Sequence, residues 1–238
     1  MKFIYGQVKS RRLGFSLGLS LTPYKVCSFD CTYCQLGKTT EKTTQRKAYL
    51  KIEDILGELK SWLAANADES KKLNYITISG SGEPTLNTRI GELITEIKKI
   101  TPIPVALITN ASLLPDPLVR QSLLVADLIV PSLDAVSPNI FEKIDHPAVG
   151  INIENIISGL VSLRREFKGK FWLEVMLVKG LNDDLRQIKK LKGIIDTINP
   201  DKIQLNSPVR TSEPGIFPVD KTKLEKIKDI LGEKAEII

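Results

Sequence analysis

The stretch Cys27-Ser28-Phe29-Asp30-Cys31-Thr32-Tyr33-Cys34 contains every cysteine of the chain within eight residues. A tetrahedral structural zinc site needs four ligands, and the usual iron–sulfur cluster also takes four thiolates. Three thiolates on a four-iron cluster therefore leave one iron without a protein ligand. Such an open metal position is where a small molecule can bind and react.

Other roles for these cysteines have less support. A disulfide is disfavoured because the number of cysteines is odd and nothing indicates secretion. A zinc ion could use His146 as its fourth ligand, but this is the only histidine and it lies more than a hundred residues away. Buried apolar cysteines would rarely cluster so tightly by chance. The pattern favours an iron–sulfur cluster with an open iron.

Length and composition fit a globular α/β protein. The chain has 238 residues, of which 42% are hydrophobic and 26% charged, and α/β barrels commonly occupy this length as one domain. The first residues, Met1 to Gly6, contain no apolar core of a signal peptide, and no run approaches the length of a membrane span. We therefore expect a cytoplasmic, reducing location and no membrane partner.

Short apolar runs alternate with longer amphipathic ones. The runs rich in Val, Ile and Leu are typical of parallel strands buried on both faces. These candidate strands are Phe15–Leu21, Tyr75–Ser79, Val105–Thr109, Leu128–Pro131, Trp172–Val178 and Lys202–Asn206. Apolar residues at helical spacing lie between or after them. These stripes begin at Ile52, Ile90, Ile153, Leu185 and Leu224.

Repeated β–α units imply parallel strands joined by right-handed crossovers. About six units fit the length, whereas a complete eight-fold barrel usually needs more residues. The sequence thus predicts an open, partial (β/α)6 barrel that forms one domain over residues 1–238. The stretch from Pro208 to Pro218 is expected to be a long loop after the last strand.

Polar residues and glycines follow the predicted strands, where active residues of parallel α/β folds gather. Glycines permit close backbone approach to a ligand, whereas Asn and Asp can also simply cap helices. The candidates at these ends are Gly80, Gly82, Glu83, Asn110, Ser132, Asp134 and Asn206. Arg210, further on, could hold an anionic substrate or be a surface residue.

The fifth predicted strand carries a charged residue on its inner face. Alternate residues of a barrel strand point inward, so Glu174 shares a face with Met176 and Val178. A charge facing a barrel interior is costly unless it is paired or functional. Glu174 is therefore expected to contact substrate or cofactor.

The spacing C-x3-C-x2-C resembles the signature of the radical SAM superfamily. Gly82-Glu83-Pro84 resembles the GGEP motif of that family, with the departure that Ser81 stands where many members have glycine. Four stretches together resemble the group related to wyosine-type tRNA synthetases. They are Arg11 to Gly18, Gly82 to Leu86, Leu181-Asn182-Asp183 and Leu205 to Arg210.

The resemblance implies an enzyme that uses a [4Fe–4S] cluster and S-adenosylmethionine. Cys27, Cys31 and Cys34 would bind the cluster, whose open iron would chelate the amino and carboxylate groups of the cofactor. An electron from a donor such as flavodoxin or ferredoxin would cleave the sulfonium, giving methionine and a 5′-deoxyadenosyl radical. The strand-end residues would bind the cofactor, with Val178 against adenine and the Asn206 backbone near the adenine edge.

The resemblance further implies an RNA or nucleotide substrate, because wyosine-type synthetases modify guanosine in tRNA. The net charge of +6 is compatible with an anionic partner, and basic residues flank the cysteines. However, the archaeal synthetases carry three further cysteines for a second cluster, which this chain lacks. The alternatives are a radical SAM enzyme acting on a protein or peptide, including glycyl-radical activation, and a non-catalytic cluster-binding protein. The glycine-rich turn and polar strand ends disfavour the last.

Overall fold

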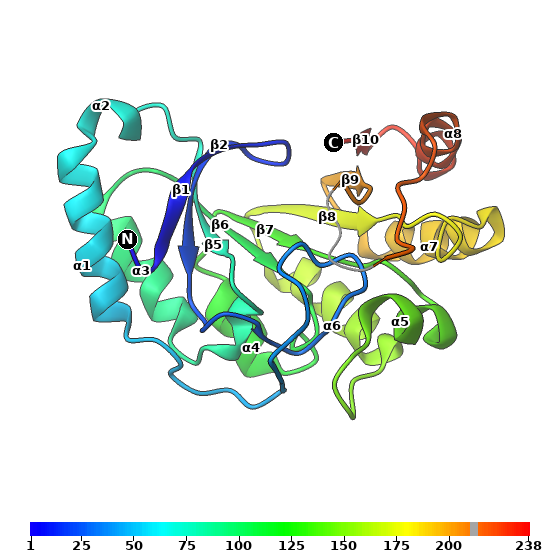
Figure 1. The fold of residues 1–238 in the computed structure, drawn as a ribbon, viewed down its shortest axis with the longest axis horizontal. Coiled ribbons are helices and arrows are strands. Elements are labelled where there is room, and N and C mark those ends of the chain that lie inside the picture. Colours follow the sequence, from blue (N-terminus) through cyan, green and yellow to red (C-terminus); the bar gives the residue numbers. More distant parts are fainter. Residues whose placement is uncertain (210–213) are drawn as a thin grey trace.

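The computed structural model describes residues 1–209 and 214–238, and its centre is an eight-stranded sheet (Figure 1). The strand order is β1-β2-β5-β6-β7-β8-β9-β10, and β3 and β4 pair separately. The strands are β1 (Ile4–Ser10), β2 (Gly14–Ser20), β3 (Val26–Cys27), β4 (Glu41–Lys42), β5 (Tyr75–Ser79), β6 (Val105–Thr109), β7 (Leu128–Pro131), β8 (Lys170–Met176), β9 (Lys202–Asn206) and β10 (Ala235–Ile237).

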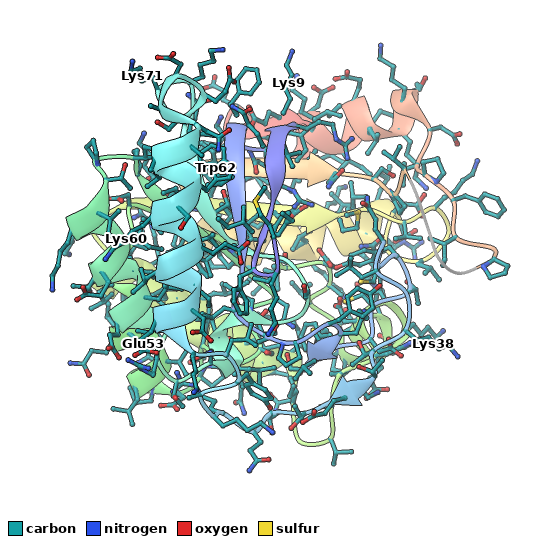
Figure 2. The ribbon with its side chains drawn as sticks, turned by 60° about the vertical axis from the view of Figure 1, so that its left-hand side comes forward. Lys9, Lys38, Glu53, Lys60, Trp62 and Lys71 are labelled. Atoms are coloured by element: carbon teal, nitrogen blue, oxygen red, sulfur yellow. The ribbon has the colours of Figure 1, made fainter. Side chains whose placement is uncertain are left out.

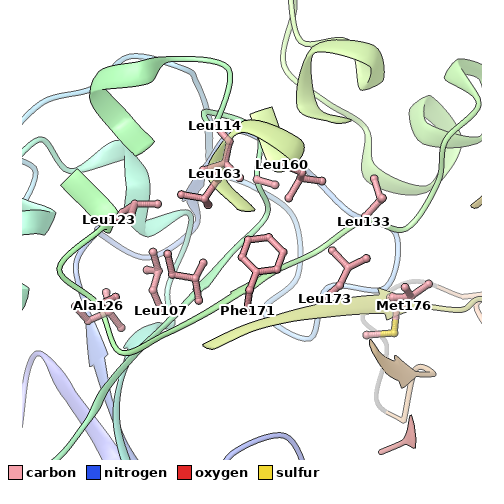
Figure 3. Packing of buried hydrophobic residues seen from close by; sticks show 14 of the residues in the cluster. Leu107, Leu114, Leu123, Ala126, Leu133, Leu160, Leu163, Phe171, Leu173 and Met176 are labelled. Carbon is pink, nitrogen blue, oxygen red and sulfur yellow. The ribbon is translucent and has the colours of Figure 1, made fainter. Parts of the chain in front are cut away.

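The six predicted strands form the parallel part of this sheet, from β2 through β5, β6, β7 and β8 to β9. Four have the predicted bounds, and β2 and β8 are each displaced toward the N-terminus. Their apolar side chains on one face pack against the surrounding helices, as Leu107, Phe171 and Leu173 do against Leu160 and Leu163 (Figure 3). The predicted partial barrel is confirmed.

The two end strands were not predicted from the sequence. β1 pairs antiparallel with β2 and is mostly exposed, while β10 has only three residues and pairs parallel with β9. Neither contains the continuous apolar run that identifies a strand buried on both faces. They extend the barrel at its two open edges.

Helices on the outer side of the sheet connect the strands. They are α1 (Ile52–Ala65), α2 (Ala67–Ser70), α3 (Ile90–Ile100), α4 (Pro117–Leu123), α5 (Pro138–Asp145), α6 (Ile153–Glu166), α7 (Leu185–Ile198) and α8 (Lys221–Leu231), with a 3-10 turn over Pro84–Leu86. The five predicted stripes correspond to α1, α3, α6, α7 and α8. The shorter α2, α4 and α5 were missed, although Asp116 caps α4 and a proline follows it, a recognisable start signal.

The turn between β1 and β2 reaches across the open side of the barrel (Figure 1). The Arg11 guanidinium donates to the Ile238 carbonyl and to Asn206 Oδ1, each at 3.1 Å, and Gln204 Nε2 donates to the Arg12 carbonyl at 3.1 Å. Leu13, at the same turn, packs with Tyr75, Ala106, Leu128 and Val130. This small apolar cluster is separate from the main hydrophobic core.

Candidate active site

A cavity of about 290 Å³ opens at the carboxyl ends of the strands. Its wall combines residues of the cysteine loop, the turn after β5, the ends of β6, β7 and β8, and the N-terminal hairpin. The lining residues are Tyr5, Arg12, Cys27, Cys31, Tyr33, Ser79, Gly80, Gly82, Glu83, Pro84, Ile108, Thr109, Asn110, Ser132, Glu174 and Met176. Eight of the sequence candidates are among them, including Glu174. Cys34, Asp134, Val178 and Asn206 are not.

The three thiols are partly buried on one loop. Cys34 N donates to the Cys31 carbonyl at 3.0 Å, Asn110 Nδ2 lies 3.6 Å from Cys27 Sγ, and Lys25 Nζ lies 3.1 Å from Cys34 Sγ. Burial, with the nearby Glu83 charge adding to it, raises the pKa of Cys27 to about 12. A metal deprotonates a coordinating thiol outright, so a bound metal would reverse this preference.

This donor set fits a four-iron cluster. In the part of the chain that the structure describes, no three Cys, His, Asp or Glu side chains lie close enough to bind one metal ion together. Each of three thiolates on a four-iron cluster binds a different iron, so they need not converge on one point. The surrounding amide and ammonium groups provide the hydrogen-bonding environment that sulfur ligands of such a cluster require.

The turn after β5 is fastened to the cysteine loop. Lys25 N donates to the Ser81 carbonyl at 2.5 Å, and Glu83 N donates to the Val26 carbonyl at 3.1 Å. A Cβ on Gly82 would lie 1.9 Å from the Val26 carbonyl oxygen. Gly82 is therefore required by close backbone approach, which brings this turn and the cysteines to the same side of the cavity.

Replacement of Gly82 by alanine should push the two loops apart. We expect it to lower the free energy of unfolding by about 1–3 kcal/mol, as overpacking does, and to reduce iron incorporation. Gly57→Ala is the matched control, because Gly57 lies in α1 with nothing within 4 Å of an added Cβ. That control should be neutral or slightly stabilising in urea unfolding. An equal free energy of unfolding and equal iron incorporation in the two variants would contradict the close approach of Gly82 to the Val26 carbonyl.

Glu83 fixes the turn through its carboxylate. Oε1 accepts from Thr85 N at 3.1 Å, from the Thr85 hydroxyl at 2.5 Å and from the Thr109 hydroxyl at 2.6 Å, while Oε2 accepts from Asn110 N at 2.8 Å. Burial raises the pKa of this carboxyl, and the hydrogen bonds oppose that effect. Glu83 thereby joins the end of β5 to the end of β6.

Ser132 lies on the cavity wall, whereas Asp134 lies behind it. Asp134 accepts a hydrogen bond from the Tyr33 hydroxyl through Oδ2 and from Met176 N at 2.8 Å through Oδ1. Burial raises the pKa of Asp134 to about 7. In this structure Asp134 therefore holds Tyr33 and the end of β8 in place, and both of those contribute to the cavity wall.

Val178 and Asn206 are also buried outside the cavity wall. Val178 N donates to Asn182 Oδ1 at 2.8 Å, in the Leu181-Asn182-Asp183 turn. Asn206 Nδ2 donates to Glu174 Oε1 at 3.0 Å. Arg210 lies outside the described residues.

Among the lining residues that sequence analysis did not single out are Arg12 and Tyr5. Arg12 Nη2 forms an ion pair of 2.5 Å with Glu174 Oε1, which explains how this buried charge is tolerated on the inner face of β8. Tyr5 lies over Gly18 and Gly80, and its hydroxyl is hydrogen-bonded to the Ser79 hydroxyl. The inward direction of Glu174 was predictable from strand alternation. Its partner was not, because Arg12 belongs to a turn at the other edge of the barrel.

A family model described as the radical SAM superfamily matches residues 21–191. The chain belongs to the radical SAM superfamily. Members use a [4Fe–4S] cluster and S-adenosylmethionine, in agreement with the cofactors predicted from the cysteine loop. No helix within the described residues combines the length and apolar character needed to cross a membrane.

Relatives extend over most of this radical SAM chain. A protein named GTPase Obg from Brachyspira hyodysenteriae is 43% identical over 95% of this chain, which spans only 33% of that protein. The UPF0026 protein MJ1312 from Methanocaldococcus jannaschii is 35% identical over the whole of this chain. The match covers 73% of the length of MJ1312. The structure of TYW1 with a lysine-pyruvate adduct bound aligns with a TM-score of 0.67 at 19% identity, over 91% of this chain and 72% of that one. This last likeness is one of fold.

Proposed function

We propose that this chain is a radical SAM enzyme of oxidoreductase or transferase type, in which Cys27, Cys31 and Cys34 bind the cluster. The observation that carries the proposal is the joining of the cysteine loop to the glycine turn at one cavity. Backbone hydrogen bonds and the Gly82 approach hold them together. A cluster-binding protein without catalysis would not need a cofactor-sized cavity beside its cysteines.

When bound and reduced, the cluster and S-adenosylmethionine supply a 5′-deoxyadenosyl radical that removes a hydrogen atom from the substrate. The residues of this chain would bind and orient the cofactor. Gly80 and Gly82 line the cavity at the end of β5, while Asn110 and Ser132 offer polar side chains from the next two strand ends. We place Asp134, Val178 and Asn206 in supporting roles, because they hold the wall of the cavity from behind.

The substrate side of the cavity lies toward the barrel interior, where Tyr5, Arg12, Ile108 and Glu174 line it. We propose an RNA or nucleotide substrate, on the basis of the resemblance to the wyosine-type group and the excess of 34 lysines and arginines over 28 acids. Lys38, Lys42 and Lys47 are exposed and follow the cysteines along the chain. The other labelled lysines, Lys9, Lys60 and Lys71, point outward elsewhere on the molecule (Figure 2).

Salt-dependent binding tests this substrate class. Phosphate contacts by lysine make affinity fall linearly with salt on a logarithmic plot. Binding to bulk tRNA should show such a slope, and the triple variant Lys38→Gln, Lys42→Gln, Lys47→Gln should reduce the slope by about 2. The matched control is Lys51→Gln, Lys60→Gln, Lys71→Gln, which removes the same charge elsewhere.

Binding that is independent of salt, or equally affected in both triple variants, would contradict contact between the loop lysines and phosphate. Absence of tRNA binding at low salt would favour a peptide substrate.

For the electron donor we propose the flavodoxin or ferredoxin class, which would approach the exposed outer side of the cysteine loop at Tyr24 and Leu36.

A further inference from the structure

Lys25 is a buried cation in the cysteine loop. Lys25 is only 2% exposed, and its Nζ lies 3.1 Å from Cys34 Sγ. None of the salt bridges within residues 1–209 and 214–238 involves Lys25. A buried ammonium is favourable where an anion lies beside it, so an anionic group bound at the cysteines would be stabilised by Lys25.

The backbone holds Lys25 in this place. Its φ of 56° lies in the left-handed region, which is unfavourable for a residue with a Cβ. Its N–H donates to the Ser81 carbonyl, and its carbonyl accepts from Thr40 N at 3.0 Å and Glu41 N at 3.2 Å. The ammonium is therefore aimed at the cysteines by anchors on both the glycine turn and β4.

We propose that Lys25 is the counter-cation of the iron–sulfur cluster and raises its reduction potential. The inference rests on the proposed function. A four-iron cluster with three thiolates is anionic, and one electron from a low-potential donor adds one negative charge without a bond being broken. A fixed positive charge at the sulfur stabilises the reduced cluster more than the oxidised one, since charge and hydrogen bonds at the sulfurs set such potentials.

The test is a redox titration of the reconstituted protein, with soluble mediators and the reduced cluster followed by electron paramagnetic resonance. Lys25→Met should decrease the ratio of reduced to oxidised cluster at a fixed potential at least tenfold, which is 59 mV for a one-electron couple. Lys25→Arg keeps the charge, so its ratio of reduced to oxidised cluster should stay close to that of the wild type. Lys60→Met removes an exposed lysine from α1 and should change this ratio less than twofold.

Iron and sulfide content separate the outcomes. A fully loaded Lys25→Met protein that titrates like the wild type would overturn the inference and leave the proposed function standing. If Lys25→Met assembles no cluster, retention in Lys25→Arg supports charge compensation, whereas loss in both variants contradicts it. A wild-type chain that assembles no cluster at all would instead refute the proposed function.

Discussion

Chains carrying Cys27→Ala, Cys31→Ala or Cys34→Ala are expected to contain no [4Fe–4S] cluster after anaerobic reconstitution, whereas the wild type should hold about four irons and four sulfides. The reason is that the chain has no other cysteine to replace a lost ligand. Iron and sulfide analysis with visible absorbance measures the effect. The apo-proteins should remain folded, because the loop is also held by backbone hydrogen bonds.

Gln35→Ala is the matched control for the cysteine variants. Gln35 is exposed and directly follows Cys34, so its replacement disturbs the same loop without removing a thiol. It should retain the wild-type iron content. A cysteine variant with wild-type iron content and absorbance would remove that cysteine from the ligand set.

Replacement of Glu83 is expected to have the largest effect on the stability of the apo-protein. Glu83→Leu would leave the four donors from Thr85, Thr109 and Asn110 without their acceptor in a buried place. Each unsatisfied buried donor is destabilising by about 1–3 kcal/mol, and rotation of the two hydroxyls offsets part of this, so we expect a loss of about 3–5 kcal/mol. Urea unfolding of the apo-protein measures it.

The free energy of unfolding of Glu83→Gln should lie between those of the leucine variant and the wild type. The amide offers one oxygen to these donors, whereas the carboxylate offers two. Glu225→Gln, on the exposed side of α8, makes the same chemical change without buried donors. It should unfold at the wild-type urea concentration. If Glu83→Leu also did so, Glu83 would not be the residue that joins β5 to β6.

The sequence was most informative where local pattern determines structure. Tyr75–Ser79 and Val105–Thr109 were predictable as strands because both their faces are buried. β1 and β10 were not predicted, because edge strands need no continuous apolar run. Short helices such as α5 were not predicted, because they contain too few turns for a periodic apolar stripe to be recognised. Strand alternation likewise indicated that Glu174 faces inward.

Contacts between distant segments could not be predicted. Nothing in the sequence near Glu174 indicates Arg12 as its partner, nor that Lys25 reaches Cys34 through a left-handed backbone. Asp134 shows the same limit. Its position after β7 suggested a cofactor contact, but only the folded chain brings the Tyr33 hydroxyl onto its carboxylate. Strand-end position identifies the neighbourhood of a site, while tertiary packing decides which side chains face the cavity.

The most direct test of the central claim is product analysis of the reconstituted protein after reduction with dithionite in the presence of S-adenosylmethionine. Chromatography with mass spectrometry should detect 5′-deoxyadenosine and methionine in equal amounts, formed slowly in the absence of substrate. Cys34→Ala should form neither. A wild-type protein with a fully loaded, reducible cluster that neither binds S-adenosylmethionine nor cleaves it would contradict the account.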